Sequence, residues 1–524
     1  MNELILSYPE ILDGQEFLTE VDPKQVKSRV FNDGLNDVEE EVSRLTSVIY
    51  ELNRCPQSLS EIESNLKTLH LRYSTISSFA RDYSIPDLRV SKKVDQLLHG
   101  LTLEMSYLFK RYVKQLDENT QWIINFQKKA AFAVNGAIYY LSLLKVETYC
   151  LNELLPSYIW RELNQLYWLA EKRKLLTQKV KFKADGLFHP SPNVQQAYAR
   201  ATIVSAISPY ELSRQEHWNL FYNLQTYVEI IQIEKHHDFD RIAKCFVVDL
   251  ASSDKPTLVD EAGVNISEGN RFIEVQAFVE RVQQQQTDLL TSGDLPKNSF
   301  INGIEPQSAK KLFNKLVEYC TQYKMRASHR YPIQVEATLV FGFSNLIQLM
   351  QRQEMVDSSA YLNEALEDLL QENHPQALTW QTVNESRGGL CVEQSSQESL
   401  DIAESMPVVL KKYQNGVVAD NWTLALTRWY KFENKTNRIG VNFIHGDIEL
   451  VELMQTDKKH ALMIRQPKDE RVFLLTSPEV LKNKKVVGLQ LKDTKQVVHC
   501  KKRMLCHEAE LVQIELTVKN KVES

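Results

Sequence analysis

Apolar residues in the first half of the chain recur at the three-to-four spacing of an α-helix. This spacing indicates helices that each bury one face. It occurs at 24–53, 58–82, 86–116, 121–151, 156–169, 194–207 and 208–234. Residues 130–144 are apolar nearly throughout, which indicates a buried central helix. We therefore predict an all-α domain of about seven helices over residues 1–240, built as a bundle or a solenoid and preceded by an extended start.

The periodicity changes in the second half of the chain. Residues 244–250 form a short β-branched run, residues 271–290 have helical spacing, and a helix capped by Ser308 reaches Tyr323. Beyond Arg330 the period approaches two, which is typical of strands. The predicted strands are 333–343, 379–383, 389–393, 407–411, 422–432, 438–444, 460–465, 471–475, 485–491, 496–506 and 509–518.

These patterns predict an α+β multidomain protein. Residues 241–325 would be a mixed connecting region that ends in a helix. Residues 326–445 would form a small antiparallel β-barrel, with an insertion at about 347–375 that contains a helix at 359–371. Residues 446–524 would form a second, C-terminal β-rich unit, barrel-like and packed on the first.

Composition and charge narrow the functional classes. The chain has 524 residues, a net charge of −6 and a pI near 6.1, which argues against bulk electrostatic binding to nucleic acid. Its seven cysteines are scattered without a Cys-x-x-Cys pair, as expected for free thiols in a reducing compartment. We see no signal peptide and no apolar run of 18 residues, so we expect a cytoplasmic protein without a membrane span.

Two arginines at the border between the helical and β-rich patterns suggest an anion site. Arg326 and Arg330 are four positions apart. The arginine fork suits phosphate oxygens and the O6/N7 edge of guanine, although most such pairs are surface charge. A second half-site lies at Asn384–Gly389, where an amide and a hydroxyl can bond a base and glycines let a flat ligand approach. The alternative is a plain hairpin turn, because Asn, Ser and Gly are turn formers.

Other clusters give weaker hypotheses. His236-His237-Asp238 is more typical of a polar helix end than of a metal site. His499-Cys500 and Cys506-His507 would bind zinc only if two strands brought them face to face, and a hairpin explains them better. No Walker loop, Gly-x-Ser-x-Gly or His-Glu-x-x-His motif is present, so we predict neither an enzyme nor a cofactor or metal site.

The two half-sites together resemble the PilZ family, whose members bind cyclic di-GMP on a six-stranded antiparallel barrel. The family pattern, Arg-x-x-x-Arg followed by Asp/Asn-x-Ser-x-x-Gly, is similar to Arg326, Arg330, Asn384, Ser386 and Gly389. The resemblance implies that the arginines grip phosphates and guanine edges, that Asn384 and Ser386 contact a guanine, and that Gly389 keeps the surface open. His329 and Arg387 are further candidates.

Two later runs, 422–429 and 438–443, also look like strands of this family. The sequence departs from the family pattern in having asparagine for the commoner aspartate and in the 54 positions between Arg330 and Asn384. The predicted insertion explains that separation, and it could also cover the site.

The resulting hypothesis is a cyclic di-GMP effector whose helical domain is the output module and binds a protein partner. The family implies a role in motility, biofilm formation or surface behaviour. Two alternatives remain at this point. One is an interaction scaffold with a PilZ-like barrel that binds no ligand. The other, which the acidic balance disfavours, is a helical nucleic-acid-binding protein.

Overall fold

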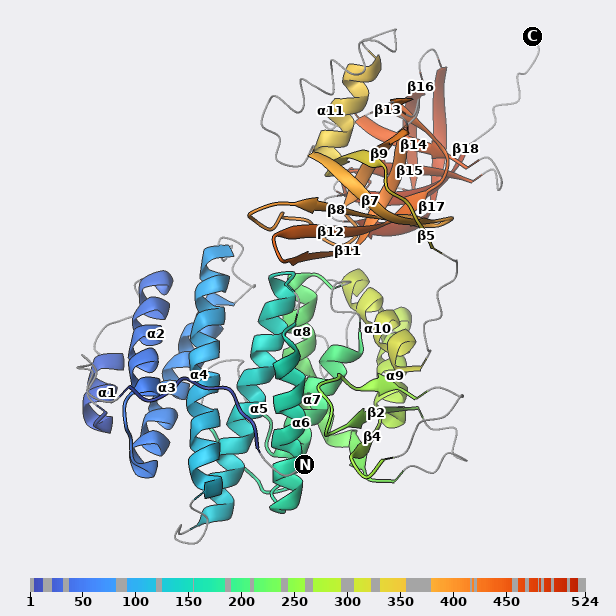
Figure 1. Cartoon of the computed structure of the whole chain (residues 1–524). Coiled ribbons are helices and arrows are strands. Elements are labelled where there is room, and N and C mark those ends of the chain that lie inside the picture. Colours follow the sequence, from blue (N-terminus) through green and yellow to red (C-terminus); the bar gives the residue numbers. More distant parts are fainter. Residues whose placement is uncertain are drawn as a thin grey trace, which may run out of the picture. The chain divides into compact units, whose positions relative to one another are not determined.

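The computed structural model divides the chain into two units, Met1–Lys324 and Met325–Ser524 (Figure 1). It describes residues 4–12, 21–31, 37–81, 92–118, 125–153, 155–183, 190–207, 212–236, 244–259, 267–293, 306–321, 330–354, 378–414, 417–418, 422–454, 460–466, 471–478, 480–481, 485–491, 494–506 and 509–516. No helix in these ranges is both long and apolar enough to cross a bilayer.

The first unit begins with antiparallel helices around a long buried one. The helices are α1 (Pro23–Phe31), α2 (Val38–Arg54), α3 (Leu59–Ala80), α4 (Lys92–Glu118), α5 (Phe126–Cys150), α6 (Ser157–Lys172), α7 (Val194–Ala206) and α8 (Arg214–Asn223). Capping boxes fix two helix starts, Ser58 with Glu61 and Ser213 with Glu216. The predicted helical N-terminal region is therefore confirmed, with the stretch 24–53 divided into α1 and α2.

Helix α5 is the centre of this unit, as its composition predicts. Every residue from Ala130 to Tyr149 is buried. The helix packs so closely on α4 that a Cβ at Gly136 would lie 2.1 Å from the Phe109 ring. Glycine at this position therefore allows the two longest helices to approach each other within one apolar core.

The end of the first unit differs from the prediction. Residues 208–234 were predicted as one helix, but α8 is followed by two short 3-10 turns and strand β1 (Gln232–Glu234). The predicted helix at 271–290 begins later, because Asn270–Glu274 is strand β4. The buried Phe272 and Ile273 of β4 belong to a four-stranded sheet. Their pairing in this sheet decides the conformation, although their spacing in the sequence is helical. The remaining elements are β2 (Cys245–Asp249), β3 (Thr257–Leu258), α9 (Gln276–Ser292) and α10 (Pro306–Thr321).

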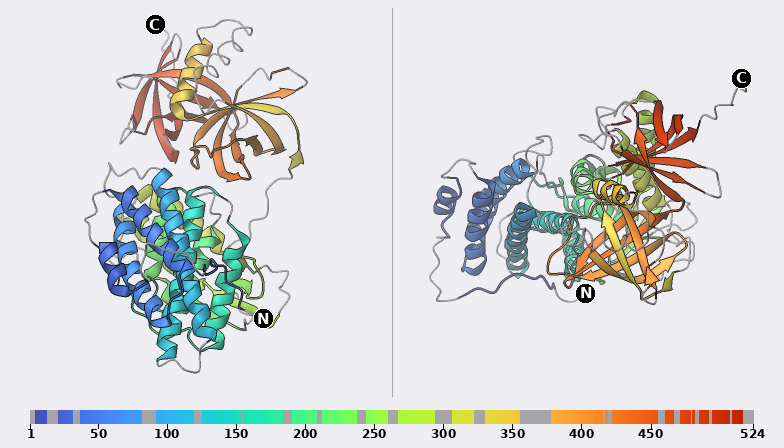
Figure 2. Two further views of the ribbon diagram at one scale, coloured as in Figure 1. Left: turned by 60° about the vertical axis from the view of Figure 1, so that its left-hand side comes forward. Right: turned by 90° about the horizontal axis from the view of Figure 1, so that it is seen from above.

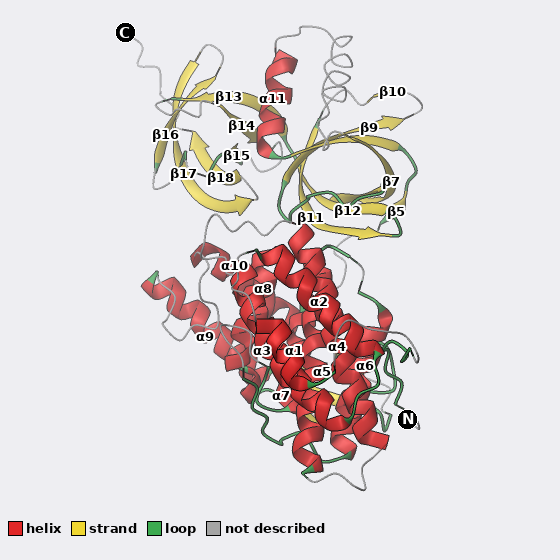
Figure 3. Cartoon of the chain, turned by 90° about the vertical axis from the view of Figure 1, so that its left-hand side faces the viewer, coloured by secondary structure: helices red, strands yellow, loops and turns green. Residues whose placement is uncertain are grey.

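The second unit starts with a closed antiparallel barrel, seen along its axis in Figure 3. Its elements are β5 (Tyr331–Pro332), β6 (Glu336–Phe341), α11 (Phe343–Glu354), β7 (Leu378–Ser386), β8 (Gly389–Ser395), β9 (Pro407–Gln414), β10 (Val417–Val418), β11 (Thr423–Glu433) and β12 (Thr436–Ile444). Six strands close the ring in the order β6-β7-β8-β12-β11-β9. The predicted first barrel is thus confirmed.

Helix α11 replaces the predicted end of the first strand. That strand was expected to reach Phe343, but it ends at Phe341, and Gly342 takes a φ of 86° before the helix begins. Only glycine adopts this conformation without strain, so the chain turns there. The helix predicted at 359–371 lies outside the described residues.

A second closed barrel follows. Its strands are β13 (Asp447–Leu453), β14 (His460–Arg465), β15 (Val472–Thr476), β16 (Val486–Leu491), β17 (Thr494–Cys506) and β18 (Ala509–Leu516). Their order, β13-β14-β15-β18-β17-β16, repeats that of the first barrel when the six ring strands of each are numbered along the chain. Strand β13 was not predicted. Its Ile448 and Leu450 pack toward the first barrel while Val451 and Leu453 fill the second, so the strand shows no clean alternation.

Helix α11 lies between the two barrels of the second unit (Figure 2), and all three share one apolar core. Leu346 and Leu349 of α11 lie between Val340 and Val409 of the first barrel and Leu462 of the second. This core covers the outer side of β6, β9 and the start of β11. The outer faces of β7, β8 and the later part of β11 are therefore left for other contacts.

Candidate functional site

The predicted half-sites meet at the start of the first barrel. Arg330 directly precedes β5, and β5 pairs with β7 so that Tyr331 lies opposite Glu385 and Pro332 opposite Asn384. One further step in this register sets Arg330 beside Ser386. Arg326 and His329 lie outside the described residues. No carboxylate in the described ranges forms an ion pair with the half-buried Arg330.

The β7–β8 hairpin holds the second half-site. Its turn consists of Arg387 and Gly388, and Ser386 lies opposite Gly389. The Ser386 hydroxyl donates to the Gly389 carbonyl oxygen over 3.3 Å. A Cβ at Gly389 would lie 2.1 Å from the Val441 carbonyl oxygen, so glycine is needed for β12 to pair here. Arg387 is exposed, and its carbonyl oxygen lies 3.1 Å from a ring nitrogen of His445.

Asn384 is a strand residue, so the plain-turn alternative does not explain it. Thr382 is buried inside the barrel, and a bulge between Thr382 and Asn384 turns the Asn384 side chain to the outer face with Cys391. Its Oδ1 is shielded from solvent, and no described residue donates a hydrogen bond to it. A buried acceptor without a donor costs about 1–3 kcal/mol, so this position favours a ligand that can donate one.

An aromatic ring lies along the same row of the sheet. Asn384 is opposite Cys391, Cys391 is opposite Gly440, and Gly440 is opposite Trp429. A Cβ at Gly440 would lie 2.2 Å from the Trp429 Nε1, so the indole lies across the glycine. The half-buried Trp429 therefore presents a flat surface near Asn384 on the outer face of the barrel.

Positive charge gathers around this row. Burial raises the pKa of the Cys391 thiol, and both Arg438 and Arg330 act to lower it. Both guanidinium groups therefore lie close enough to Cys391 to interact with its charge. Arg438 donates to Glu393 Oε2 over 2.5 Å from Nη2, so it is partly neutralised.

The nearby carboxylate of Glu385 is also neutralised. Lys412 Nζ donates to both of its oxygens, at 2.8 and 2.9 Å. Because this pair cancels its own charge, Glu385 does little to repel an anion bound beside Arg330.

Sequence reasoning did not assign a role to Trp429, Arg438 or Cys391. A signal was present, because Arg438 and Gly440 alternate with the buried Ile439 and Val441 and so face outward. What the sequence does not contain is the pairing that sets β12 between β8 and β11. That pairing sets Trp429 on β11 in the same row as Cys391 on β8, with one strand, β12, between them.

The two weaker metal hypotheses gain no support from the geometry. His236 is exposed, and His237 and Asp238 lie outside the described residues. His499, Cys500 and Cys506 all belong to β17, so they do not come from two facing strands. Within the described ranges, no three His, Cys, Asp or Glu side chains are grouped as metal ligands.

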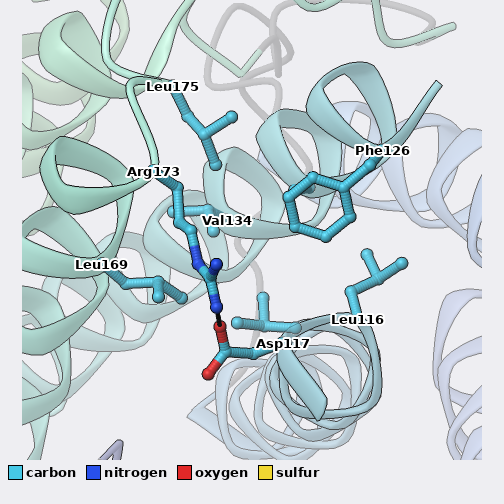
Figure 4. A pocket seen from close by; sticks show the side chains of 9 residues that line it. Leu116, Asp117, Phe126, Val134, Leu169, Arg173 and Leu175 are labelled. Atoms are coloured by element: carbon cyan, nitrogen blue, oxygen red, sulfur yellow. Dashed lines mark hydrogen bonds and ion pairs between the residues drawn. The ribbon is translucent and has the colours of Figure 1, made fainter. Parts of the chain in front are cut away.

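A hollow of about 10 Å³, open to solvent, lies among α4, α5 and α6 of the first unit (Figure 4). Apolar side chains such as Leu116, Phe126 and Leu169 line it. Asp117 and Arg173 approach to 2.6 Å on one side. This ion pair neutralises itself, and the hollow has room for little more than a water molecule.

Comparison with known proteins adds one finding about the helical unit. Residues 34–237 match the family model for the N-terminal domain of the cyclic-di-GMP receptor FimW. The match spans α2 to β1 and does not reach either barrel. No curated protein matches the chain. The helical part is thus similar to a receptor's N-terminal domain, while the likeness of the first barrel to PilZ proteins rests on its own residues.

Proposed function

We propose that this protein is a receptor for cyclic di-GMP of the PilZ type, acting in the cytoplasm by binding and not by catalysis. Two independent observations support the proposal. The helical unit is similar to the N-terminal domain of a cyclic-di-GMP receptor. The register of β5 with β7 brings Arg330 to the same edge as Asn384 and Ser386. This second observation carries the proposal, because it unites two half-sites that are far apart in the sequence.

Each group at this edge has a matching part in the dinucleotide. The Arg330 guanidinium, with Arg326, would bind phosphate oxygens and a guanine edge. The Asn384 Oδ1, which lacks a donor, would accept from the N–H groups of a guanine. Trp429 lies two strands from Cys391, with β12 between them, and would stack on a base, which is worth about 1–3 kcal/mol. Gly388, where an added Cβ would meet nothing within 4 Å, leaves room for a flat ligand.

Titration calorimetry with cyclic di-GMP tests the proposal. We expect binding to the wild-type chain and a loss of at least tenfold in affinity for Arg326→Ala, Arg330→Ala and Asn384→Ala. Arg465→Ala is a matched control, because this arginine is on the second barrel and 42% exposed. Absence of binding by the wild type would contradict the receptor assignment and favour the ligand-free scaffold.

The same site can be coupled to an output. The boundary between the two units falls at Lys324 and Met325, next to Arg326 in the sequence. A ligand held by Arg326 and Arg330 would bias the arrangement of the units if it prefers one of them. We expect the helical unit to bind a protein partner accordingly, in control of motility or surface behaviour.

Small-angle scattering of the full chain, with and without cyclic di-GMP, tests this coupling. The wild type should show a ligand-dependent change in the scattering curve, and Asn384→Ala should show none. An unchanged scattering curve at saturating ligand would show that ligand binding does not change the arrangement of the units, and it would contradict the proposed coupling.

A further inference from the structure

The first residues of the chain lie against the helical unit, in contact with α2, α4 and α6. Residues 4–12 are extended and pass from the end of α2 over α4 to α6 (Figure 1). Leu12 N donates to the Arg54 carbonyl oxygen at 3.0 Å, and Ile5 N donates to Gln165 Oε1 at 2.9 Å. The sequence predicted an extended start, but it gave no sign that this segment has a dedicated set of partners.

A buried ion pair lies at the centre of these contacts. Lys110 on α4 donates to Glu162 on α6 over 2.9 Å, and both side chains are wholly inaccessible to solvent. Ser7 completes the cluster from the extended segment. Its N and Oγ donate to Glu162 Oε1 at 2.7 and 2.6 Å, and Lys110 Nζ donates to the Ser7 Oγ at 3.1 Å.

This surface therefore recognises features that are not unique to this segment. Three of the contacts, those of Ile5, Ser7 and Leu12, use main-chain N–H groups, which any extended peptide possesses. Among the described residues 4–12, the side chain that hydrogen-bonds to the ion pair is the hydroxyl of Ser7. A peptide without it would leave two buried charged groups short of a hydrogen-bond partner, which is more costly than losing an exposed contact.

Apolar anchoring of the segment is modest. Leu4 is buried and Leu6 packs partly against the core, whereas Ile5, Ile11 and Leu12 are each more than 40% exposed. A fixed structural segment would gain more from apolar burial than from a desolvated ion pair. Directional polar groups beneath a lightly anchored strand are what a binding site for peptides requires.

We propose that the surface formed by α4 and α6 around Lys110 and Glu162 is a binding site for an extended peptide of a partner protein, and that residues 4–12 occupy it within the chain. The partner segment would carry the pattern apolar-any-apolar-Ser/Thr, as in Leu4-Ile5-Leu6-Ser7. Its inward apolar residues would replace Leu4 and Leu6, and its hydroxyl would replace that of Ser7. The proposal concerns the helical unit and does not depend on ligand binding by the barrel.

Cleavage of the connection tests this without removing any contact. A specific protease site is inserted within residues 13–20 of the full chain, the chain is cut, and labelled peptide 1–12 is added in excess. We expect the labelled peptide to replace the cut segment, as seen by fluorescence anisotropy. If the cut chain loses its helical signal, or if no exchange occurs within a day, the segment is structural and the proposal fails.

Competition by other peptides tests the specificity. A peptide with Ser7→Thr should compete within about threefold of the original, and a Ser7→Ala peptide at least tenfold less well. Unrelated peptides with the apolar-any-apolar-Ser pattern should compete, and scrambled versions should not. If the Ser7→Ala peptide competes as well as the original peptide, the ion pair does not contribute to recognition of the hydroxyl. If only the chain's own sequence competes, the segment serves as an internal contact of this chain, and the proposal of a partner site fails.

Discussion

The two barrels have the same strand order but differ in what their outer faces offer. The first presents Arg330 without an ion-pair partner in the described ranges, and a shielded Asn384 oxygen without a donor. On the second, Lys501 pairs with Glu515 at 2.8 Å. Where Arg330 precedes the first barrel, His445 and Gly446 precede the second.

This difference lies in side chains and not in the fold. A closed six-stranded ring with the same connections is present twice, and Arg330, Asn384 and Trp429 belong to the first copy. The proposed site would therefore depend on a few residues of the first barrel. Equivalent substitutions in the two barrels test this view.

The largest effect is expected at the glycines. Gly389→Ala would place a Cβ 2.1 Å from a backbone oxygen of β12, whereas Gly488→Ala in the second barrel would place one 3.2 Å from the Cβ and the Sδ of Met454. We expect Gly389→Ala to lower the free energy of unfolding by about 3 kcal/mol and to weaken cyclic di-GMP binding. Gly488→Ala should cost less than about 1 kcal/mol. Urea unfolding of the full chains measures both, and equal costs would contradict the steric argument.

Replacement of the indole should affect binding more than stability. Trp429→Ala removes the stacking surface and should weaken cyclic di-GMP binding by roughly 1–3 kcal/mol in calorimetry. Trp429→Phe keeps an aromatic face and should retain most of the affinity. If alanine and phenylalanine lose affinity equally, Trp429 does not stack on a base.

Asn384→Leu should separate function from stability. The variant removes a shielded acceptor to which no described residue donates, so the unliganded chain should gain about 1 kcal/mol in unfolding free energy while binding is lost. Thermal unfolding with and without cyclic di-GMP measures both. A destabilised variant would indicate that the Asn384 oxygen is already satisfied in the unliganded protein.

The smallest effect concerns pH and the second barrel. Burial raises the pKa of Glu510, and the nearby Arg503 lowers it only in part. The folded state therefore binds a proton more readily than the unfolded state, and the contribution of Glu510 to stability falls as pH rises from below the ordinary glutamate pKa through the raised value. Glu510→Gln should flatten this dependence between pH 4 and 7 in urea unfolding. An unchanged slope would argue against the raised pKa.

The sequence predicted the helices well because their apolar stripes match what the core buries. Residues 130–144 were expected to be central, and the structure buries all of them. Prediction failed where a residue's burial depends on a distant partner. The strand Asn270–Glu274 has helical spacing, but its pairing with β1 and β2 decides its conformation.

The site was predictable only in its parts. Arg330, Asn384 and Ser386 could be picked out by residue type and spacing, and the β5–β7 register brings them to one edge. Trp429 could not be assigned, because its position depends on strand order across the barrel. Arg326 and His329 stay predictions, since they lie outside the described residues.

The core shared by the two barrels can be completed only after the last strand has been synthesised. Val340 in the first barrel and Leu511 in the last strand belong to the same apolar cluster, 171 residues apart in the chain. At about 5–20 residues per second, the ribosome needs roughly ten to thirty seconds to travel between them. During that time the apolar outer side of the first barrel is not yet covered by the second barrel, while the helical unit has already been synthesised. Until the last strand has been synthesised, this apolar surface can associate with other chains, so the C-terminal unit is exposed to aggregation during its synthesis.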